Sequence, residues 1–205
     1  MVPLTVADLL PLEEYAARRR EFFDSHRRYL DRYRRVRIGP RLTLIFENRQ
    51  TLWFRVQEII RIARLAEPEE VQLELNLYNR LLPNRQRLQA ALLIEISDET
   101  LLLKELAPWR DLKGDHLRLC LGDAAYPAHL VTCRPEDRTI GTAHWVQFQL
   151  DDQAAAFLAD ELRPAIFAFD NDTYQHQSGP LSADLRLSLA DDLQLSEREA
   201  ARVAA

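Results

Sequence analysis

The segment VRIGPRLTLIFENRQTLWFRVQEIIRIAR, residues 36–64, changes its hydrophobic period near its middle. Its first part reads as two short strands around a turn at Gly39 and Pro40, because every second residue after the turn is apolar. Its second part, from Thr51 to about Leu65, has apolar residues at helical spacing, and Asn48 can cap that helix. The segment therefore predicts a strand pair that passes directly into a helix.

A long N-terminal helix is expected upstream of this segment. Thr5 and Asp8 have the spacing of a capping box, and a stripe of apolar residues then recurs at three- and four-residue steps to about Arg35. Arg19 and His26 fall inside the stripe. We interpret them as an arginine whose head group reaches solvent and as a hydrogen-bonded or rim histidine.

The rest of the chain alternates between strand and helix patterns. Helices are expected at residues 68–83, 98–109, 152–162 and 182–193, and strands at 88–96, 115–122, 126–133, 142–150 and 165–169. Helices at both ends with strands clustered between them predict the α+β class, with a mainly antiparallel sheet and helices packed on one face. We expect one domain over residues 1–193 and a frayed or disordered tail over 194–205.

The composition is typical of a globular protein of the cytoplasm. Hydrophobic residues make up 47% of the 205, and no stretch approaches the roughly 20 apolar residues that span a bilayer. There is also no signal-peptide pattern at the start. The net charge of −5 argues against a general nucleic-acid binder.

Motifs for metal, cofactor or nucleophile chemistry are missing from the sequence. Cys120 and Cys133 lack CxxC spacing, so we expect reduced thiols and no zinc site or disulfide framework. The chain has no GxSxG, P-loop, GxGxxG or HExxH pattern. His116, Arg118 and Cys120 share one strand face, which we interpret as a solvent-facing row and not a metal site. No metal and no cofactor is therefore predicted.

Polar residues on the helix at 51–65 form the first candidate site. On a helical wheel most apolar residues form one stripe, but others gather on the far side around Glu58. Glu58 and Arg61 are then partly desolvated and can pair at i,i+3, while Gln57 and Arg61 are neighbours at i,i+4. Buried charges need partners, so this cluster is either a structural ion pair or the wall of a polar pocket.

The strand TAHWVQFQL, residues 142–150, holds the second candidate. Its alternation puts His144 on the same face as Val146 and Phe148, which is a core face. Such a histidine is either a hydrogen-bonded core residue or a ligand or base. Glu58, Glu95 and Glu47 are all possible partners, and the sequence does not choose among them.

Five segments resemble an uncharacterised bacterial family, domain of unknown function 3501. They are RIGPRLTLIFENRQTLWFRVQEIIR, LELNLYNRLLPN, LLIEI, TAHWVQF and DNDTY, and the resemblance runs from about Leu4 to Leu193. Polar positions that match the family pattern are Glu47, Arg49, Thr51, Gln57, Glu58, Arg61, Glu95, His144, Asp170 and Tyr174. The chain departs from the pattern at Ala63 and Asn76, where acids are expected, and at Asn171-Asp172, where His-Pro is expected.

The resemblance implies a place in redox or peroxide defence, because members are often encoded beside rubrerythrin-like and iron–sulfur proteins. We therefore expect a non-enzymatic accessory protein that binds a rubrerythrin-like or iron–sulfur protein. We expect no association with a membrane. The proposed docking surface is the arginine-rich face of the first helix, with Arg27, Arg28 and Arg32. These arginines could also be only a solvated helix face.

Two alternative functions remain open. The first is an enzyme or small-molecule binder with a polar pocket built from Glu58, Arg61 and His144. The wider set of candidate pocket residues is Glu47, Arg49, Gln57, Glu58, Arg61, Glu95 and His144. The second is RNA binding through the first helix, which the acidic total and the lack of an aromatic stacking platform disfavour.

Overall fold

The computed structural model describes residues 1–132 and 141–203, and for residue 99 and residues 194–203 it describes the backbone alone. The helices are α1 (Leu12–Tyr33), α2 (Arg49–Ala63), α3 (Pro68–Asn79), α4 (Leu102–Leu106), α5 (Asp152–Ala159) and α6 (Ala183–Val203). The strands are β1 (Arg35–Ile38), β2 (Leu42–Phe46), β3 (Arg87–Ile94), β4 (Leu117–Leu121), β5 (Ala124–Val131), β6 (Ala143–Gln149), β7 (Ala165–Asp170) and β8 (Gln175–Gln177). The predicted α+β class with a long N-terminal helix is confirmed.

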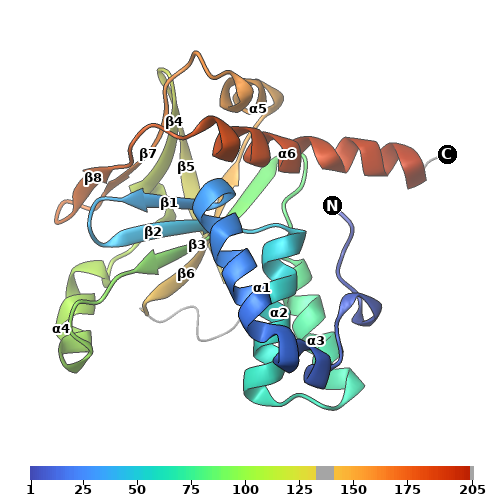
Figure 1. The fold of residues 1–205 in the computed structure, drawn as a ribbon. Helices are drawn as coiled ribbons and strands as arrows, with labels where there is room; N and C mark the ends of the chain where they lie inside the picture. The colour runs from blue at the N-terminus through green and yellow to red at the C-terminus, as the bar shows by residue number, and fades with distance from the viewer. Residues whose placement is uncertain (133–140, 204–205) are drawn as a thin grey trace.

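All eight strands form one antiparallel sheet in the order β1-β2-β3-β6-β5-β4-β7-β8. The sheet curls until its two ends approach each other (Figure 1). The hydroxyl group of Tyr174, in the turn before β8, donates to the carbonyl of Ile38 at 2.6 Å and accepts from the amide of Arg41 at 3.0 Å. Tyr174 therefore ties the β7–β8 end to the β1–β2 turn.

That closure requires glycine at position 39. Gly39 has φ +62°, and a Cβ atom there would lie 2.4 Å from the Tyr174 hydroxyl oxygen and 2.5 Å from Cγ of His176. Both the left-handed backbone and the lack of space exclude a larger residue. The predicted turn at residues 39 and 40 thus also sets how tightly the curled sheet closes.

The inner face of the curled sheet forms the main hydrophobic core. Phe46, Phe148 and Phe167 meet at its centre, with ring centroids 5.4–6.1 Å apart. Helices α5 and α6 pack against the same core through residues such as Leu158 and Leu189. This is the largest apolar cluster among the described residues.

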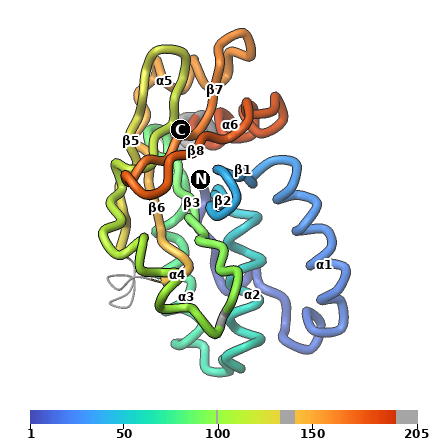
Figure 2. The backbone as a smooth tube through the Cα atoms, turned by 90° about the vertical axis from the view of Figure 1, so that its left-hand side faces the viewer, coloured from blue at the N-terminus to red at the C-terminus, as the bar shows by residue number. Residues whose placement is uncertain are grey.

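Helices also cover the outer face of the sheet. Trp145 points away from the inner face and packs, with Tyr78 of α3 at a ring-centroid distance of 6.4 Å, against the apolar side of α2. Helices α1, α2 and α3 lie side by side with α2 between the other two (Figure 2). The prediction that helices pack on one face only is therefore wrong. The pattern of an amphipathic helix shows which of its sides is buried, but it does not show which face of the sheet covers that side.

Two sets of polar contacts fix α2 and α6. Asn48 caps α2 as expected, since its Oδ1 accepts from the amide of Thr51 at 3.0 Å and its own amide donates to the Thr51 hydroxyl at 2.8 Å. Arg34, at the end of α1, forms a buried ion pair with Asp192 of α6.

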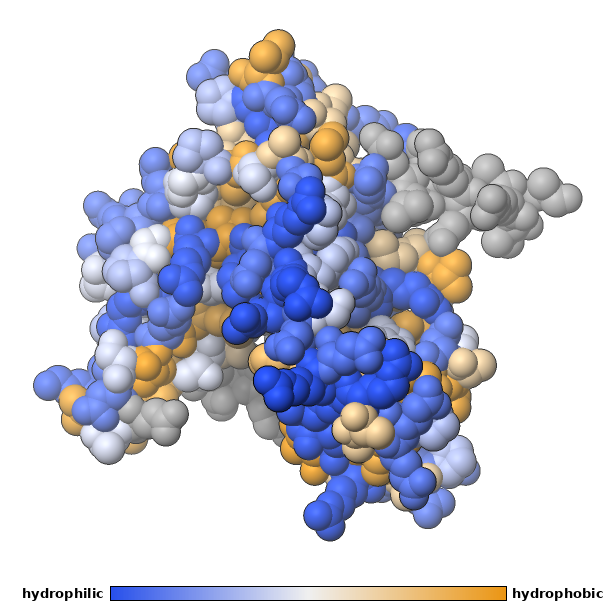
Figure 3. Space-filling model, viewed as in Figure 1, coloured by the Kyte–Doolittle hydropathy of each residue, from blue (hydrophilic) through white to orange (hydrophobic). Residues whose placement is uncertain are grey.

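Helix α6 runs to Val203, beyond the predicted end at 193. The solvent-facing side of α1 is strongly hydrophilic (Figure 3).

Candidate functional site

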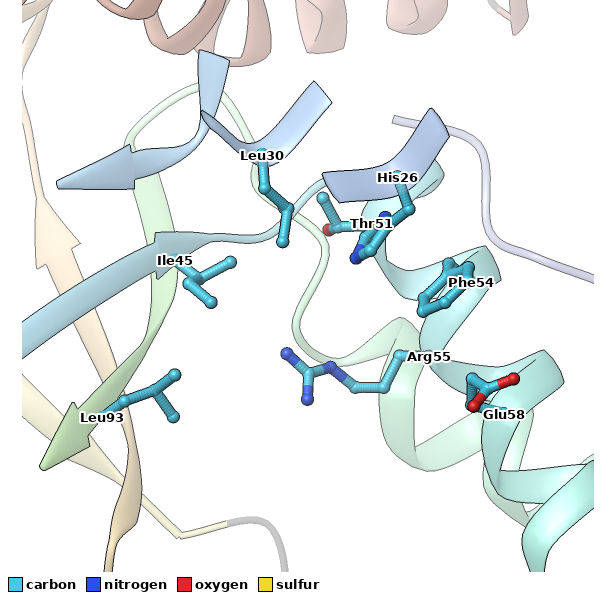
Figure 4. A pocket seen from close by; sticks show the side chains of 8 residues that line it. All are labelled: His26, Leu30, Ile45, Thr51, Phe54, Arg55, Glu58 and Leu93. Atoms are coloured by element: carbon cyan, nitrogen blue, oxygen red, sulfur yellow. The ribbon is translucent and has the colours of Figure 1, made fainter. Parts of the chain in front are cut away.

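A cavity of about 260 Å³ lies between α1, α2 and the outer face of strands β2 and β3. Its apolar wall is formed by Leu30, Ile45, Phe54 and Leu93, and its polar wall by His26, Thr51, Arg55 and Glu58. Figure 4 shows the guanidinium group of Arg55 extending from α2 toward Ile45 and Leu93. The cavity therefore combines a charged group with an apolar lining, as small-molecule sites do.

Arg55 is held in place by a buried carboxylate and an aromatic ring. Its Nη2 donates to Oε1 of Glu47 at 2.5 Å, and the Glu47 side chain is 0% exposed. The second carboxylate oxygen of Glu47 accepts from the Thr51 hydroxyl at 2.5 Å. The guanidinium carbon lies 5.0 Å from the ring centroid of Trp145. The side chain is nevertheless 34% exposed, and among the described residues Nη2 alone has a hydrogen-bond partner.

Glu58 accepts hydrogen bonds from three side chains. Tyr15 donates its hydroxyl at 2.8 Å, Arg19 donates from Nη2 at 2.8 Å and from Nε at 3.0 Å, and Arg61 donates from Nη2 at 3.0 Å. Burial raises the pKa of Glu58, but the hydrogen bonds from Arg19, Arg61 and Tyr15 outweigh it and lower the pKa to about 2. Glu58 is therefore a permanent carboxylate at neutral pH.

His26 stacks on Phe54 of α2, with ring centroids 4.0 Å apart and an interplanar angle of 13°. Burial is the main cause that lowers the pKa of His26, the charges of Arg55 and Arg35 add to it and Glu58 acts in the opposite direction, and the result is a pKa of about 4. At neutral pH the imidazole is uncharged. It therefore extends the aromatic part of the cavity wall and adds no positive charge.

The charges around the cavity do not balance. Three guanidinium groups, from Arg19, Arg55 and Arg61, surround two carboxylates, those of Glu47 and Glu58. Arg55 is paired one to one with Glu47, so the positive charge left over belongs to Arg19 and Arg61, which both pair with Glu58 and do not line the cavity themselves. Arg55 lines the cavity. The arrangement can bind an anion without any change in protonation.

The cavity includes only part of the predicted polar pocket. Glu58 lines it, whereas Glu47 and Arg61 do not line it and instead form ion pairs with the lining residues Arg55 and Glu58. The i,i+3 pairing of Glu58 with Arg61 is as expected from their spacing. The cluster is thus an ion-pair network that also forms one wall of a cavity.

Three other predicted pocket residues lie elsewhere. Arg49 pairs with Asp8 at 2.6 Å, and buried Gln57 donates to the carbonyl of Leu10 at 3.4 Å, so both hold the N-terminal segment against α2. Glu95 is exposed just after β3. The structure does not bring these residues to the cavity.

His144 is on the other face of the sheet. It pairs in register with Leu92 of β3, which belongs to the inner core, whereas the adjacent Leu93 lines the cavity on the outer face. Its Nε2 lies 3.0 Å from the carbonyl oxygen of Gly141. The sheet itself therefore separates His144 from Glu58.

Arg55 is the main site residue that the sequence interpretation missed. It lies eight residues from Glu47, and α2 begins between them, so no helical or strand spacing links the two. Phe54 and His26 also belong to the site, although the sequence interpretation placed Phe54 only in the apolar group around Glu58 and His26 only in the stripe of the first helix. Only the approach of α1 and the sheet to α2 brings these residues together.

The three arginines proposed as a docking surface have different surroundings. Arg32 of α1 pairs with Asp184 of α6 at 2.8 Å. Arg27 and Arg28 are exposed and have no ion pair or hydrogen bond among the described residues. Two of the three are therefore available to a partner, while Arg32 helps to connect α1 with α6.

No group of three or more His, Cys, Asp or Glu in the described part of the chain could hold a metal ion. Within the same residues no helix is long and apolar enough to cross a membrane. Burial raises the pKa of the Cys120 thiol, which makes it less reactive. Cys133 lies outside the described residues.

Comparison with known proteins identifies relatives of unknown function. The model of the family described as "Protein of unknown function (DUF3501)" matches residues 3–193. A crystal structure of a novel protein of unknown function from Burkholderia pseudomallei K96243 is similar at a TM-score of 0.84 and 30% sequence identity, covering 94% of this chain and 100% of that chain. No curated protein matches the chain.

Proposed function

The chain belongs to the DUF3501 family, and for this member we propose that it binds a small anionic molecule in the cavity between α1, α2 and the sheet. The observation that supports this most is the guanidinium group of Arg55. It is fixed at the cavity by Glu47, yet its terminal nitrogens keep N–H donors that have no partner among the residues that the structure describes. A positioned cation beside an apolar wall is the usual means of orienting a small anion.

The protonation states favour binding over acid–base catalysis. The pKa of Glu58 is lowered to about 2 and that of His26 to about 4. A general acid or base works best when its pKa lies near the working pH. Neither group meets that condition at neutral pH, so the cavity is better suited to holding a ligand than to moving a proton.

Thermal-shift and calorimetric titrations with small anions, and with neutral and cationic molecules of matched shape, test the proposal. We expect stabilisation by anions only. The effect should be lost in the double variant Glu47→Gln/Arg55→Met, which removes the guanidinium without leaving a buried carboxylate unpaired. It should also be lost in Ile45→Phe, which fills the cavity, but not in Leu73→Phe, which enlarges a leucine that is 68% exposed.

Failure has two clear forms in these titrations. If no anion stabilises the wild-type protein, the cavity is not an anion site. If Glu47→Gln/Arg55→Met and Ile45→Phe respond to anions as fully as the wild type, the anion binds elsewhere on the molecule.

Partner binding through α1 is a second candidate function. Arg27 and Arg28 are exposed and without partners among the described residues, which is the specific observation in its favour. In this proposal the protein is a cytoplasmic accessory factor of a redox-stress system, and its acidic partner is a rubrerythrin-like or iron–sulfur protein, as the family resemblance implies.

An anaerobic pull-down with purified candidate partners tests the second proposal. Arg27→Glu/Arg28→Glu should abolish capture of the partner, because both charges at the exposed face are reversed. Retained capture by this variant with an intact circular-dichroism spectrum would reject α1 as the docking surface. Arg110→Glu, at an exposed arginine beyond α4, is the matched control and should leave capture unchanged.

A further inference from the structure

We propose that the ligand of the cavity is a hydrophobic monocarboxylate, with one carboxylate group and a hydrophobic part of about one ring or an equivalent aliphatic chain. This inference rests on the proposed function, since it assigns a chemical class to the anion bound there. Three properties of the cavity lead to it: its excess charge, the donors that Arg55 has left, and the size and lining of its apolar part.

The charge balance selects a monoanion. Arg55 and Glu47 neutralise each other, and Arg19 and Arg61 together leave one positive charge over next to Glu58, which lines the cavity. A ligand with one negative charge neutralises it, whereas a dianion leaves a net negative charge next to two partly or fully buried carboxylates. His26 does not change this balance at neutral pH, because it is uncharged and stacks on Phe54.

The free donors of Arg55 select a planar pair of oxygen atoms. A guanidinium group has five N–H bonds in a fixed fork. One of those on Nη2 donates to Glu47, and Nε is covered by protein atoms without a partner. Within the described part of the chain this leaves Nη1 and the second N–H of Nη2 as unused donors, and two such donors match the two oxygens of a carboxylate. Because Glu47 and the ring of Trp145 already restrain the side chain, little rotamer freedom is lost on binding.

The apolar wall of the cavity, opposite Arg55, indicates that the ligand has a hydrophobic part. Leu30, Ile45 and Leu93 approach from α1, β2 and β3, and Phe54 with the stacked His26 adds an aromatic surface. The volume of about 260 Å³ exceeds the roughly 150 Å³ of an apolar cavity that holds benzene in another protein. The additional volume accommodates a carboxylate group and a short linker, so a carboxylate with one ring fits the cavity. Acetate is too small to cover the apolar wall and would leave most of it in contact with water.

Isothermal titration calorimetry with matched probes tests this assignment on the full chain. The probes are 3-phenylpropanoate, its neutral amide, acetate, benzylmalonate as the dianion with the same ring, and inorganic phosphate. We expect 3-phenylpropanoate to bind roughly tenfold or more tightly than each of the others, the loss that a missing charge-assisted hydrogen bond or an unburied ring produces. Glu47→Gln/Arg55→Met should lose this preference for the acid over the amide, while Leu73→Phe should keep it.

The outcomes separate this inference from the proposed function. If phosphate or benzylmalonate binds as tightly as 3-phenylpropanoate, or more tightly, and Glu47→Gln/Arg55→Met abolishes that binding, the anion site stands and the monocarboxylate assignment is overturned. Equal affinity for the acid and its amide also overturns the assignment. If none of the anions binds the wild-type protein, both proposals fail.

Discussion

Removing the positive charge of Arg55 should destabilise the protein through the carboxylate it leaves behind. Glu47 is 0% exposed, and Arg55→Met takes away its cation while the Thr51 hydroxyl remains its hydrogen-bond donor. Breaking a buried ion pair in this way costs about 3–5 kcal/mol. Because the Arg55 side chain is 34% exposed and Thr51 still donates, we expect a smaller cost of about 2–3 kcal/mol.

Urea unfolding monitored by circular dichroism measures this cost, and a thermal scan should show a midpoint lower by about 4–12 °C for a chain of this length. The double variant Glu47→Gln/Arg55→Met should recover to within about 1 kcal/mol of the wild type, since no buried charge remains. Arg85→Met is the control, because Arg85 pairs at the surface with Asp152 and exposed pairs contribute about 1 kcal/mol or less.

Two results would refute this reasoning. A cost for Arg55→Met no larger than that for Arg85→Met would show that Glu47 does not depend on its cation. A double variant as unstable as Arg55→Met alone would show that the cost comes from lost packing of the arginine stem and not from an unpaired carboxylate.

Three further predictions concern the fold around the site. Asp192→Leu alone should cost about 3–5 kcal/mol because buried Arg34 loses its partner, whereas Arg34→Met/Asp192→Leu should recover most of it in urea unfolding. The pKa of His26 is about 4 in the folded protein and about 6.5 when unfolded, so the unfolded chain binds the proton first. The contribution of His26 should therefore be close to zero above pH 6.5 and should cost about 1–2 kcal/mol of stability by pH 5. Asp192, whose pKa burial raises to about 6, acts in the opposite direction in the wild type and in His26→Phe alike, so the wild type should lose about 1–2 kcal/mol more than His26→Phe in the same titration. Gly39→Ala should cost about 2 kcal/mol or more by thermal unfolding, because its Cβ would lie 2.4 Å from a hydroxyl oxygen. Gly122→Ala, at a similar φ of +60° with open space around it, should cost only the backbone strain of about 1 kcal/mol.

The sequence pattern was sufficient to predict those structural features whose interacting residues are close together in the sequence. Asn48 and Thr51 cap α2 across three residues, and Glu58 pairs with Arg61 across three. The turn at Gly39 and the alternation of β2 and β6 are likewise properties of a few consecutive residues. These features depend on backbone periods of 2 and 3.6 residues, which the order of apolar residues records directly.

The same reasoning explains why His144 and Glu58 could not be placed relative to each other. Alternation correctly put His144 on a core face, but the sheet has apolar residues on both faces. Which face meets α2 depends on how the curled sheet packs. A histidine on the inner face and a carboxylate on a helix outside it look equally buried in the sequence.

The sequence by itself determined the fold class, most of the helices and strands, and the pairing of Glu58 with Arg61, which lies one helical turn away. It did not show β8, and it predicted a helix over residues 98–109 where α4 spans only Leu102–Leu106. Tertiary structure decided the site, because Tyr15 and Arg19 reach Glu58 across 43 and 39 residues, and the cavity needs α1, α2 and two strands at once. The reason is physical. Hydrogen bonds and packing within a turn are fixed by backbone geometry, whereas contacts between distant elements are fixed only when burial of both sheet faces selects one arrangement.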